Sequence, residues 1–576
     1  MANKGLINRD KTEPRPSRGQ IISRILFGRT MPQKMFRAYL LAIIIGAILL
    51  YLPIALQHGY HIYVYSGATN NHIEDSHKTY TFWDALLISC SALSTTGLTP
   101  VALSINLTVF GQVIVFLLFE FGGIGLLSVI YLLWTLFRRK ARDQLAETVI
   151  LQAERGNEKI AGTMSTLKRS IVLILVVQVF FAFIFSFWLC FMPLHHQIEF
   201  NNGLSSYDDP TKYISAHHNY GKAFWQGLFM SGSAINNGGF DILDGESSLS
   251  ALRNDWNVIF QLMILFELIM GGIGYPLIFD FWEKMKYKRK GLKYRISLFT
   301  KICLLGFIAV SVIGLAFTFG FEYGFKGDTI NNISVQDNQV IWHVQAKDIA
   351  HYSVLWTGAT ENYDFNSTFG RHPEFNKAFA IFFNSMTTRS AGFTTVSMNT
   401  LSPGSQWTYI LLMFIGGSPS STAGGIRTTT LVIAIAAIVS FIRGKKEVTL
   451  FHRTIPQTKV RGSFIVIITG VAVVCLFAIL IYLTSTFANN DASTGNTFMV
   501  TGTNGVLETF FEAASAIGTV GASMGLTPTI NDFGLVLLML LMFIGYLGIS
   551  STLLSWTKKN PRGNLIRYAE EDVRIG

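Results

Sequence analysis

A short motif that ends near a glycine occurs four times along the 576-residue chain, and it limits the fold more than any other feature. The copies are SALSTTGLTP at Ser91–Pro100, SAINNGGFD at Ser233–Asp241, MTTRSAGFTT at Met386–Thr395 and SAIGTVGAS at Ser515–Ser523. Apolar, aromatic-rich residues precede each copy, which predicts a short helix followed by a loop at the glycine. Four such segments in one chain indicate tandem repeats around a common axis.

Composition places these repeats in a membrane. Half of the residues are hydrophobic and 14% are charged, whereas a typical soluble domain has about 25% charged residues. Several apolar runs exceed the roughly 20 residues that cross a bilayer as a helix. The formal net charge of +11 comes from clusters of Lys and Arg between the apolar runs, which indicates membrane orientation and not nucleic-acid binding.

These patterns predict an all-α polytopic membrane protein with four repeats of span, pore helix, filter loop and span around a pseudo-fourfold pore axis. We expect a basic leader at 1–35, repeats at 36–142, 143–290 (with a preceding cytoplasmic connection), 291–445 and 446–557, and a tail at 558–576. The second spans of the repeats are expected at about 107–137, 258–282, 407–442 and 533–556, in a total of eight full spans and four half-spans. The rule that positive loops stay inside makes both termini cytoplasmic. The outer segment 320–375 is expected to carry some strand or turn structure.

The loops are predicted to bind a cation. A half-helix that ends at mid-membrane points its unsatisfied carbonyl groups and a partial negative charge beyond its end. Glycine allows the following loop to turn its carbonyl groups inward, and rings of such groups replace the hydration shell of an ion. One such motif alone is more often helix packing, but four in equivalent places favour a filter. Its predicted residues are Thr95, Thr96, Gly97, Leu98, Asn237, Gly238, Gly239, Phe240, Ser390, Ala391, Gly392, Phe393, Thr519, Val520, Gly521 and Ala522.

Two arginines accompany these features. Arg389, inside the third copy, is expected to contact acidic or carbonyl groups behind the filter, and bracing and direct tuning of the pore are both open. Arg427 follows GGSPSSTAGG in the third repeat, a stretch too rich in Gly, Ser and Pro to remain helical, so only this second span is expected to break. The break is interpreted as a gate, with a passive kink anchored by Arg427 as the alternative. The predicted gate comprises Gly416, Gly417, Ser418, Pro419, Ser420, Ser421, Thr422, Ala423, Gly424, Gly425 and Arg427.

Other reactive residues give no catalytic pattern. Cys90, Cys190, Cys303 and Cys475 lie in apolar segments without CxxC spacing, so neither a disulfide framework nor a zinc site is predicted. No nucleophile with a base, phosphate-binding loop or catalytic carboxylate pair is evident. The chain is therefore not expected to be an enzyme.

At SAINNGGFD, TTRSAGFTT, SAIGTVG and GGSPSSTAGGIRTTT the sequence resembles the Trk/Ktr/HKT superfamily of potassium transporters. The tail RYAEEDVRIG and the stretch ETVILQAERGN resemble the Ktr-type membrane subunit. The resemblance implies potassium uptake through a homodimer in the plasma membrane, each subunit with its own pore, resting on a cytosolic ring of nucleotide-binding regulatory subunits. It implies potassium in the filter, no covalent cofactor and no nucleic-acid partner, and it leaves sodium dependence open.

Two residues qualify this resemblance. Gly97 follows the family pattern of filter glycines that is associated with potassium selectivity. Tyr546 departs from the pattern, because the family usually has an arginine there, and Arg427 would then act alone. The alternative function is a symporter that obligatorily couples potassium to sodium or protons, for which Glu120 and Glu267 are the main acidic candidates within spans. A place near the outer end of its helix is the alternative for either glutamate.

Overall fold

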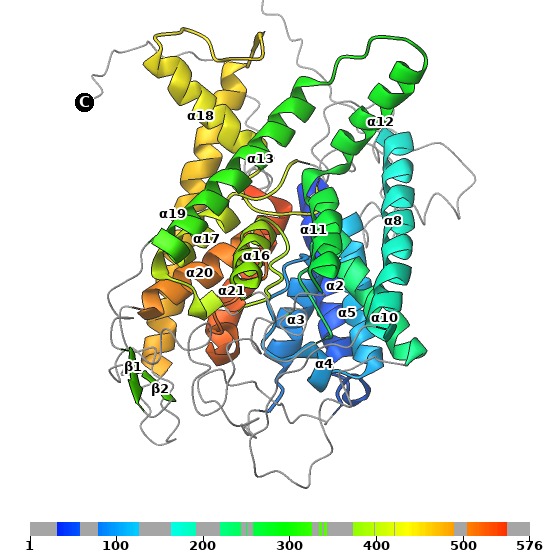
Figure 1. Ribbon diagram of the computed structural model, residues 1–576, viewed down its shortest axis with the longest axis vertical. Coiled ribbons are helices and arrows are strands. Elements are labelled where there is room, and N and C mark those ends of the chain that lie inside the picture. Colours follow the sequence, from blue (N-terminus) through cyan, green and yellow to red (C-terminus); the bar gives the residue numbers. More distant parts are fainter. Residues whose placement is uncertain are drawn as a thin grey trace, which may run out of the picture.

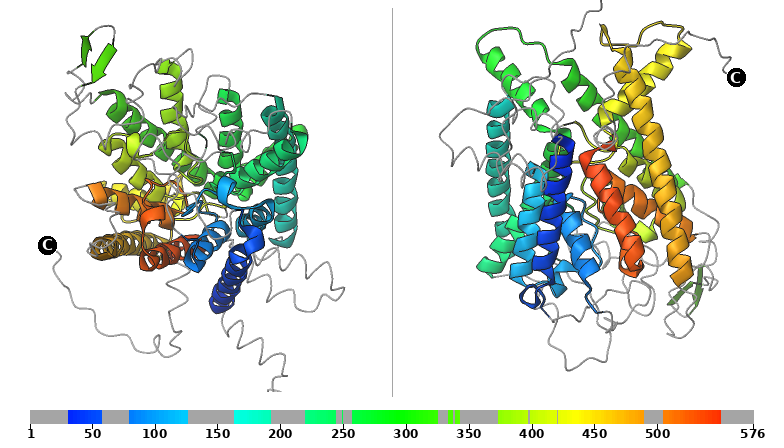
Figure 2. Two further views of the ribbon diagram at one scale, coloured as in Figure 1. Left: turned by 90° about the horizontal axis from the view of Figure 1, so that it is seen from below. Right: turned by 180° about the vertical axis from the view of Figure 1, so that it is seen from behind.

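The computed structural model describes residues 31–57, 79–125, 163–191, 219–243, 249, 257–324, 333–336, 339–342, 373–396, 398–419, 421–488 and 504–549. These residues are mostly helical, and the helices gather into one bundle (Figures 1 and 2). The predicted tail, most of the predicted leader and the stretch ETVILQAERGN lie outside the described residues.

The order of a long helix, a short helix, a loop and a second helix occurs four times. Unit 1 contains α2 (Met31–Tyr51), α3 (Phe82–Leu93) and α5 (Val109–Ile124), and unit 2 contains α8 (Thr163–Phe191), α10 (Tyr220–Ile235) and α11 (Val258–Ile273). Unit 3 contains α13 (Leu298–Phe319), α16 (Pro373–Thr387) and α17 (Pro403–Phe414), and unit 4 contains α19 (Gln457–Ala488), α20 (Asn504–Gly518) and α21 (Asp532–Leu547). The predicted short helices before the four glycine motifs are confirmed.

The remaining elements join or extend the units. The helical ones are η1 (Pro53–Ala55), α4 (Leu103–Asn106), α12 (Tyr275–Arg289), η4 (Gly320–Gly324), η6 (Met398–Thr400), α18 (Thr428–Ile442) and η7 (Thr527–Thr529). Antiparallel hairpins are formed by β1 (Ile333–Gln336) with β2 (Gln339–Trp342), and by β3 (Thr449–Leu450) with β4 (Arg453–Thr454). The first hairpin confirms strand structure in the outer segment, and the second was not predicted.

Polar side chains begin the second helices of units 1, 3 and 4. Thr108, Ser402 and Asn531 each accept a hydrogen bond from the backbone N–H three residues later. Each cap therefore satisfies one of the N–H groups that lack a partner in the first turn of a helix. The caps fix where these helices start after the glycine loops.

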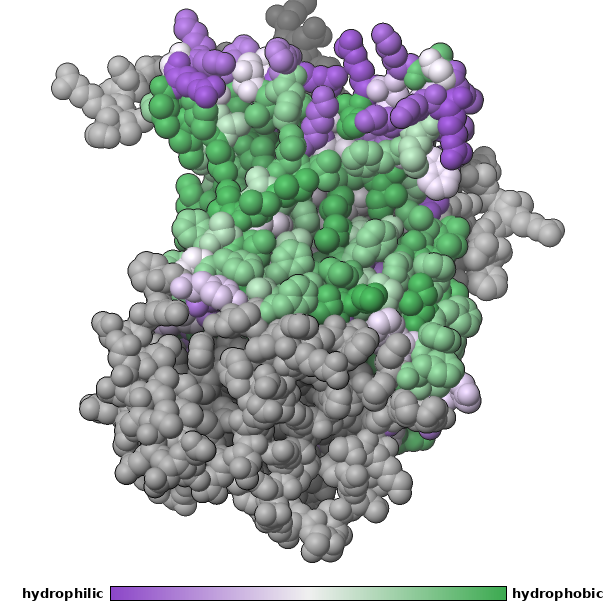
Figure 3. Space-filling model, viewed as in Figure 1, coloured by the Kyte–Doolittle hydropathy of each residue, from purple (hydrophilic) through white to green (hydrophobic). Residues whose placement is uncertain are grey.

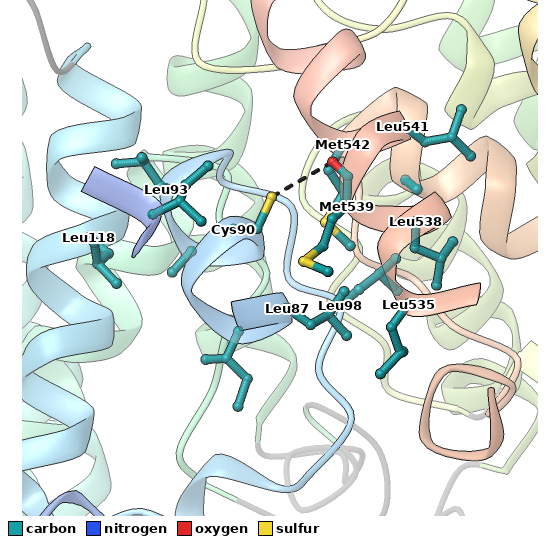
Figure 4. Packing of buried hydrophobic residues seen from close by; sticks show 14 of the residues in the cluster. Leu87, Cys90, Leu93, Leu98, Leu118, Leu535, Leu538, Met539, Leu541 and Met542 are labelled. Atoms are coloured by element: carbon teal, nitrogen blue, oxygen red, sulfur yellow. Dashed lines mark hydrogen bonds between the residues drawn. The ribbon is translucent and has the colours of Figure 1, made fainter. Parts of the chain in front are cut away.

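The short helix of each unit packs against the second helix of the unit before it. The contacting pairs are α10 with α5, α16 with α11, α20 with α17, and α3 with α21. In the last pair Cys90 donates a hydrogen bond to the carbonyl oxygen of Met539 at 3.7 Å, between apolar side chains from both helices (Figure 4). Because unit 1 contacts unit 4, the four units close into a circle.

The second helices end at glycines, which corrects part of the sequence prediction. Gly125, Gly274 and Gly548 follow α5, α11 and α21, with φ angles of 92°, 91° and 83°. A residue with positive φ cannot continue a right-handed helix. The predicted span at 258–282 is therefore bent, since α12 turns by 94° from α11. The predicted break in the third unit is confirmed, but it is not confined to that unit.

An apolar band covers the face of the bundle that Figure 3 shows, with hydrophilic side chains at one end. Among the described residues three helices are long and apolar enough to cross a membrane: Arg169–Phe191, Leu298–Tyr323 and Gln457–Thr484. The bent pair Val258–Ile273 and Leu277–Arg289 makes a fourth if it is counted as one span. The other expected spans are shorter apolar helices or extend beyond the described residues.

Candidate functional site

A serine at the end of the short helix holds the loop that follows it in units 1 and 4. The carbonyl oxygen of Ser91 accepts a hydrogen bond from Thr96 N at 2.8 Å, and its hydroxyl oxygen accepts one from Gly97 N at 3.0 Å. Ser515 makes the two corresponding contacts in unit 4, both at 3.0 Å. In these two units the serine of the repeated Ser-Ala pair therefore serves to hold the glycine loop.

Units 2 and 3 use related contacts. The carbonyl oxygen of Ser233 accepts a hydrogen bond from Gly238 N at 2.7 Å. In unit 3, where the motif lacks the serine, the carbonyl oxygen of Thr387 accepts from Gly392 N at 3.0 Å. The Thr387 hydroxyl group also donates to Phe393 O at 2.6 Å. Each loop is thus tied to the end of its own short helix.

Left-handed backbone conformation occurs at equivalent places in the loops. In units 1, 2 and 4 the motif glycine and the residue two positions before it both have positive φ. These residues are Thr95 (51°) and Gly97 (98°), Asn237 (55°) and Gly239 (68°), and Thr519 (49°) and Gly521 (92°), while unit 3 has Gly392 (64°). Such φ angles are uncommon for residues with side chains, so the surrounding structure must hold the three non-glycine residues in place.

The four motif glycines contact one another in a closed ring. A Cβ atom on Gly97 would lie 2.7 Å from Gly238 O, on Gly239 2.1 Å from Ala391 O, on Gly392 2.3 Å from Val520 O, and on Gly521 2.0 Å from Thr96 O. Each of these oxygens belongs to the residue just before the glycine of the next unit. A side chain at any of the four positions would collide with backbone, so each requires glycine.

Within the loops, the ring glycines Gly97, Gly239 and Gly521 are partly exposed, while the residues on both sides of them are buried. The buried members of the predicted filter are Thr95, Thr96, Leu98, Asn237, Gly238, Phe240, Ser390, Ala391, Gly392, Phe393, Thr519, Val520 and Ala522. The structure therefore brings all sixteen predicted residues together in four adjoining loops.

The segment between α17 and α18 is a closed loop. Gly416 N donates to Ile426 O at 2.9 Å, so the two ends of the segment lie side by side. Thr428 fastens them again, because its N donates to Gly417 O at 3.0 Å and its hydroxyl group donates to Gly416 O at 2.9 Å. Ser420 is the one member of the predicted gate that lies outside the described residues.

This loop contacts the other three units. The contacts are Ser418 N to Gly272 O of unit 2 at 3.2 Å, Thr95 Oγ1 of unit 1 to Thr422 O at 3.4 Å, and Gly424 N to Thr519 Oγ1 of unit 4 at 2.8 Å. Thr95 and Thr519 are themselves loop residues with positive φ. The segment from unit 3 therefore lies directly against the glycine loops of units 1 and 4.

Both predicted arginines bind backbone carbonyl groups. Arg427 donates to the carbonyl oxygens of Ala423 and Ser418, inside its own loop. Arg389 is fully buried, donates from Nη1 to Ile415 O at 2.6 Å, and lies 5.1 Å from the centre of the Phe307 ring. The expectation that Arg389 contacts carbonyl groups is confirmed, and the carbonyl group is the one at the start of the loop.

Tyr546 joins three helices, which the sequence did not reveal. Its hydroxyl group donates to Gly122 O of α5 at 2.7 Å and lies 2.9 Å from the hydroxyl group of Tyr39 on α2. By its place in the repeat EFGGIG, MGGIG, IGGSP and IGYLG of the second helices, Tyr546 corresponds to Gly123, Gly272 and Gly417. It is the one member of this set with a side chain.

The hydrogen bond of Glu120 joins units 1 and 2, and that of Glu267 lies within unit 2. Glu120 accepts a hydrogen bond from Gln178 Nε2 at 2.6 Å, and Glu267 accepts one from Ser231 Oγ at 2.6 Å. Both glutamates are buried, and they lie four and six residues before the last residues of α5 and α11. No cluster of three or more His, Cys, Asp or Glu side chains in the described part of the chain could hold a metal ion.

Comparison with known proteins identifies the family. A family model described as "TrkH: Cation transport protein" matches residues 31–568. The "Uncharacterized cation transporter MG322 homolog" of Mycoplasma pneumoniae is 34% identical over 574 residues, which cover 96% of this chain and 97% of that protein. The "Ktr system potassium uptake protein D" of Bacillus subtilis is 29% identical over 540 residues, with 93% and 95% coverage.

A solved structure agrees with the fold. The "Potassium Transporter TrkH from Vibrio parahaemolyticus" matches with a TM-score of 0.52 at 15% identity, over 83% of this chain and 79% of that one. At this level of identity the likeness concerns the fold alone. Because the family model covers nearly the whole sequence and the relatives match along almost their full length, the chain belongs to the TrkH family of cation transport proteins, which are transporters and not enzymes.

Proposed function

We propose that the protein takes up potassium across the plasma membrane through a filter made of the four glycine loops. The observation that carries the proposal is the closed ring of the four glycine loops. In this ring a backbone carbonyl group of each loop lies against the motif glycine of the preceding unit, and a carbonyl group of unit 1 lies against Gly521 of unit 4. Close-set carbonyl groups of this kind replace the hydration shell of an ion. The relatives named for potassium uptake support potassium as the cargo.

The short helices strengthen the attraction for a cation. Each of the four loops follows directly on the C-terminal end of α3, α10, α16 or α20. A helix C-terminus carries a partial negative charge, equivalent to about half an elementary charge. Four such ends around one ring favour a cation there, and an inside-negative membrane potential of 100 mV adds about 2.3 kcal/mol per charge in the inward direction.

The loop between α17 and α18 is proposed as the gate of this path. It contacts glycine loops of units 1 and 4, and it brings the positive charge of Arg427 near them. Its two ends are fastened to each other, so a movement of the loop would break its hydrogen bonds to Thr95 and Thr519 of the glycine loops and change access to the filter. The passive-kink alternative predicts no change in flux when the loop is altered.

Assembly and orientation complete the proposal. We expect a homodimer in the plasma membrane with both termini cytoplasmic, resting on a cytosolic ring of nucleotide-binding regulatory subunits. The clusters of Lys and Arg between units support the orientation. No covalent cofactor is proposed.

Potassium flux into vesicles tests this function. The purified protein is reconstituted alone, an inside-negative potential is imposed, and uptake is measured with and without sodium and with and without a proton gradient. Selective uptake of potassium without sodium or a proton gradient is the expected result. Uptake that requires sodium or a proton gradient would favour the coupled symporter instead, and uptake of sodium equal to that of potassium would contradict a potassium filter.

A further inference from the structure

A buried carboxylate lies behind the loop of unit 4. Glu512 is on α20, nine residues before Gly521, and its side chain is completely buried. Its Oε1 atom accepts hydrogen bonds from the Ser523 hydroxyl group and from Met524 N, the latter at 3.2 Å. Its Oε2 atom accepts one from Thr527 Oγ1 at 3.0 Å. Glu512 thereby holds the part of the chain that leads out of the ring at Gly521.

The hydrogen bonds around Glu512 fit an ionised carboxylate. Ser523 Oγ already accepts a hydrogen bond from Gly525 N at 2.9 Å, so its own hydrogen is free to donate to Glu512. Met524 contributes a backbone N–H, which can only donate. Hydrogen bonds from several donors to a charged oxygen are among the stronger ones in proteins. Three donors therefore surround the two side-chain oxygen atoms of Glu512, an arrangement that can hold a carboxylate beside the loop.

Unit 3 makes the same brace without the charge. Asn384 lies eight residues before Gly392, and its Oδ1 atom accepts a hydrogen bond from Thr395 N at 3.1 Å. Thr395 lies three residues after Gly392, as Met524 lies three residues after Gly521. The two braces are thus equivalent in geometry and differ in charge.

The other two units have apolar side chains at this place. Ile88 lies nine residues before Gly97, and Met230 nine residues before Gly239, and both are completely buried. Among these four equivalent positions, Glu512 alone has a side chain that can carry a charge. A loop brace alone does not require an acid, because the amide of Asn384 supplies the same acceptor.

We propose that Glu512 is a specificity-determining residue of the ion path, which positions the loop of unit 4 and supplies a negative charge that raises the affinity for a monovalent cation. The proposal rests on the filter described under the proposed function. Its charge adds to the negative C-terminal end of α20. One of the four sides of the path would then attract the ion more strongly than the others.

The test is potassium binding by purified protein, followed through the potassium dependence of its thermal unfolding, with choline replacing potassium at constant ionic strength. Ligands that bind the folded state raise its stability according to their dissociation constant. Glu512→Gln keeps an acceptor oxygen for Ser523 and Met524 but removes the charge. We expect the potassium concentration that gives half of the stabilisation, the midpoint, to rise about three- to tenfold. A change of this size corresponds to the loss of the partly screened Coulomb attraction between the ion and one unit charge.

Charge transfer to unit 3 separates the electrostatic role from the brace. Adding Asn384→Asp to Glu512→Gln restores a carboxylate at the equivalent place, and we expect it to recover at least half of the lost affinity. Glu322→Gln is the matched control: Glu322 accepts hydrogen bonds from Ser402 at the start of α17, and its loss should leave the midpoint unchanged.

Three results would overturn the proposal. An unchanged midpoint in Glu512→Gln, in a protein whose wild type binds potassium, would contradict the charge and leave the proposed function intact. Loss of stability without a change in midpoint, or no recovery with Asn384→Asp, would show that Glu512 is a brace only. Unfolding of the wild type that is independent of potassium would contradict both this proposal and the filter.

Discussion

The hydroxyl group of Tyr546 donates a hydrogen bond to the carbonyl oxygen of Gly122 at 2.7 Å, which ties the last helix of unit 4 to the corresponding helix of unit 1. The two residues are 424 positions apart in the sequence. Together with the contact between α3 and α21, this bond closes the circle of units.

Removal of this hydroxyl group should destabilise the protein. We expect Tyr546→Phe to lower the free energy of unfolding by about 1 kcal/mol, because Gly122 O loses the Tyr546 donor and keeps only Gly125 N, while the aromatic packing stays. Thermal unfolding in detergent measures the change. Tyr409→Phe is the control, since the buried Tyr409 hydroxyl group has no hydrogen-bond partner among the described residues, and its removal should be neutral or stabilising. Equal losses in the two variants would contradict the role of the bond.

The ring should respond to a side chain on Gly97. In Gly97→Ser the new Cβ atom would lie 2.7 Å from Gly238 O, and the residue would have to keep a φ of 98°. We expect the ratio of potassium to sodium uptake to fall at least about threefold, because the carbonyl groups move from their places around the ion. Relative uptake of the two ions into vesicles measures it. Gly291→Ala is the control, with a φ of 69° and no atoms within 4 Å of its Cβ position; a similar loss there would attribute the effect to backbone strain alone.

Weakening the loop between α17 and α18 should raise basal flux. Arg427→Gln removes a positive charge and the hydrogen bonds to Ala423 and Ser418. We expect potassium uptake without regulatory subunits to rise about twofold or more, since a charge that repels the cation is gone. Deletion of residues 418–423 should act in the same direction. Arg443→Gln, at the exposed end of α18, should leave uptake unchanged. Unaltered or lower uptake in folded Arg427→Gln and deletion variants would favour the passive kink.

The junction of α12 and α13 should weaken at high pH. Tyr294 donates a hydrogen bond to Asp280, and this bond together with partial burial raises the pKa of the Tyr294 phenol above its ordinary value. The unfolded chain ionises near pH 10, so the contribution of the bond is fully present below that pH and is lost as the pH rises through the higher value of the folded state. The stability difference between wild type and Tyr294→Phe should therefore be constant from pH 7 to pH 9 and shrink above about pH 10.

Unfolding in detergent at a series of pH values measures this difference. Tyr287→Phe is the control, because the Tyr287 ring packs on Tyr294 at 5.2 Å and its replacement should leave the pH dependence in place. A difference between wild type and Tyr294→Phe that persists unchanged at pH 11 would contradict the role of the bond to Asp280.

The sequence predicted those features that depend on short stretches of chain. The short helices and the loops at Gly97, Gly239, Gly392 and Gly521 follow from a local motif that occurs four times. The break in unit 3 follows from the density of Gly, Ser and Pro between Gly416 and Gly425, which no helix tolerates. A charge at Arg389 in an apolar segment has to find oxygen atoms, so its carbonyl contact was predictable as well.

Features that depend on the backbone path or on contacts between segments were not predictable. Gly274 stands in an apolar run where a glycine is equally typical of close helix packing, and only its φ of 91° reveals the turn between α11 and α12. The brace of Glu512 needs the path of the loop that returns to it 11 to 15 residues later. Tyr546 gives no sign in the sequence of its bond to Gly122, because the two residues meet only when the circle of units closes.

The closed ring of glycines has a consequence for how such a chain changes over generations. A substitution of the glycine in one loop would displace the backbone of a neighbouring loop, because every motif glycine lies against the backbone of the next unit. The four copies of the motif therefore constrain one another's substitutions, although they lie far apart in the sequence. Half of this chain would leave the ring open on two sides, and a shorter ancestor with two units would have needed a second copy of itself to complete it.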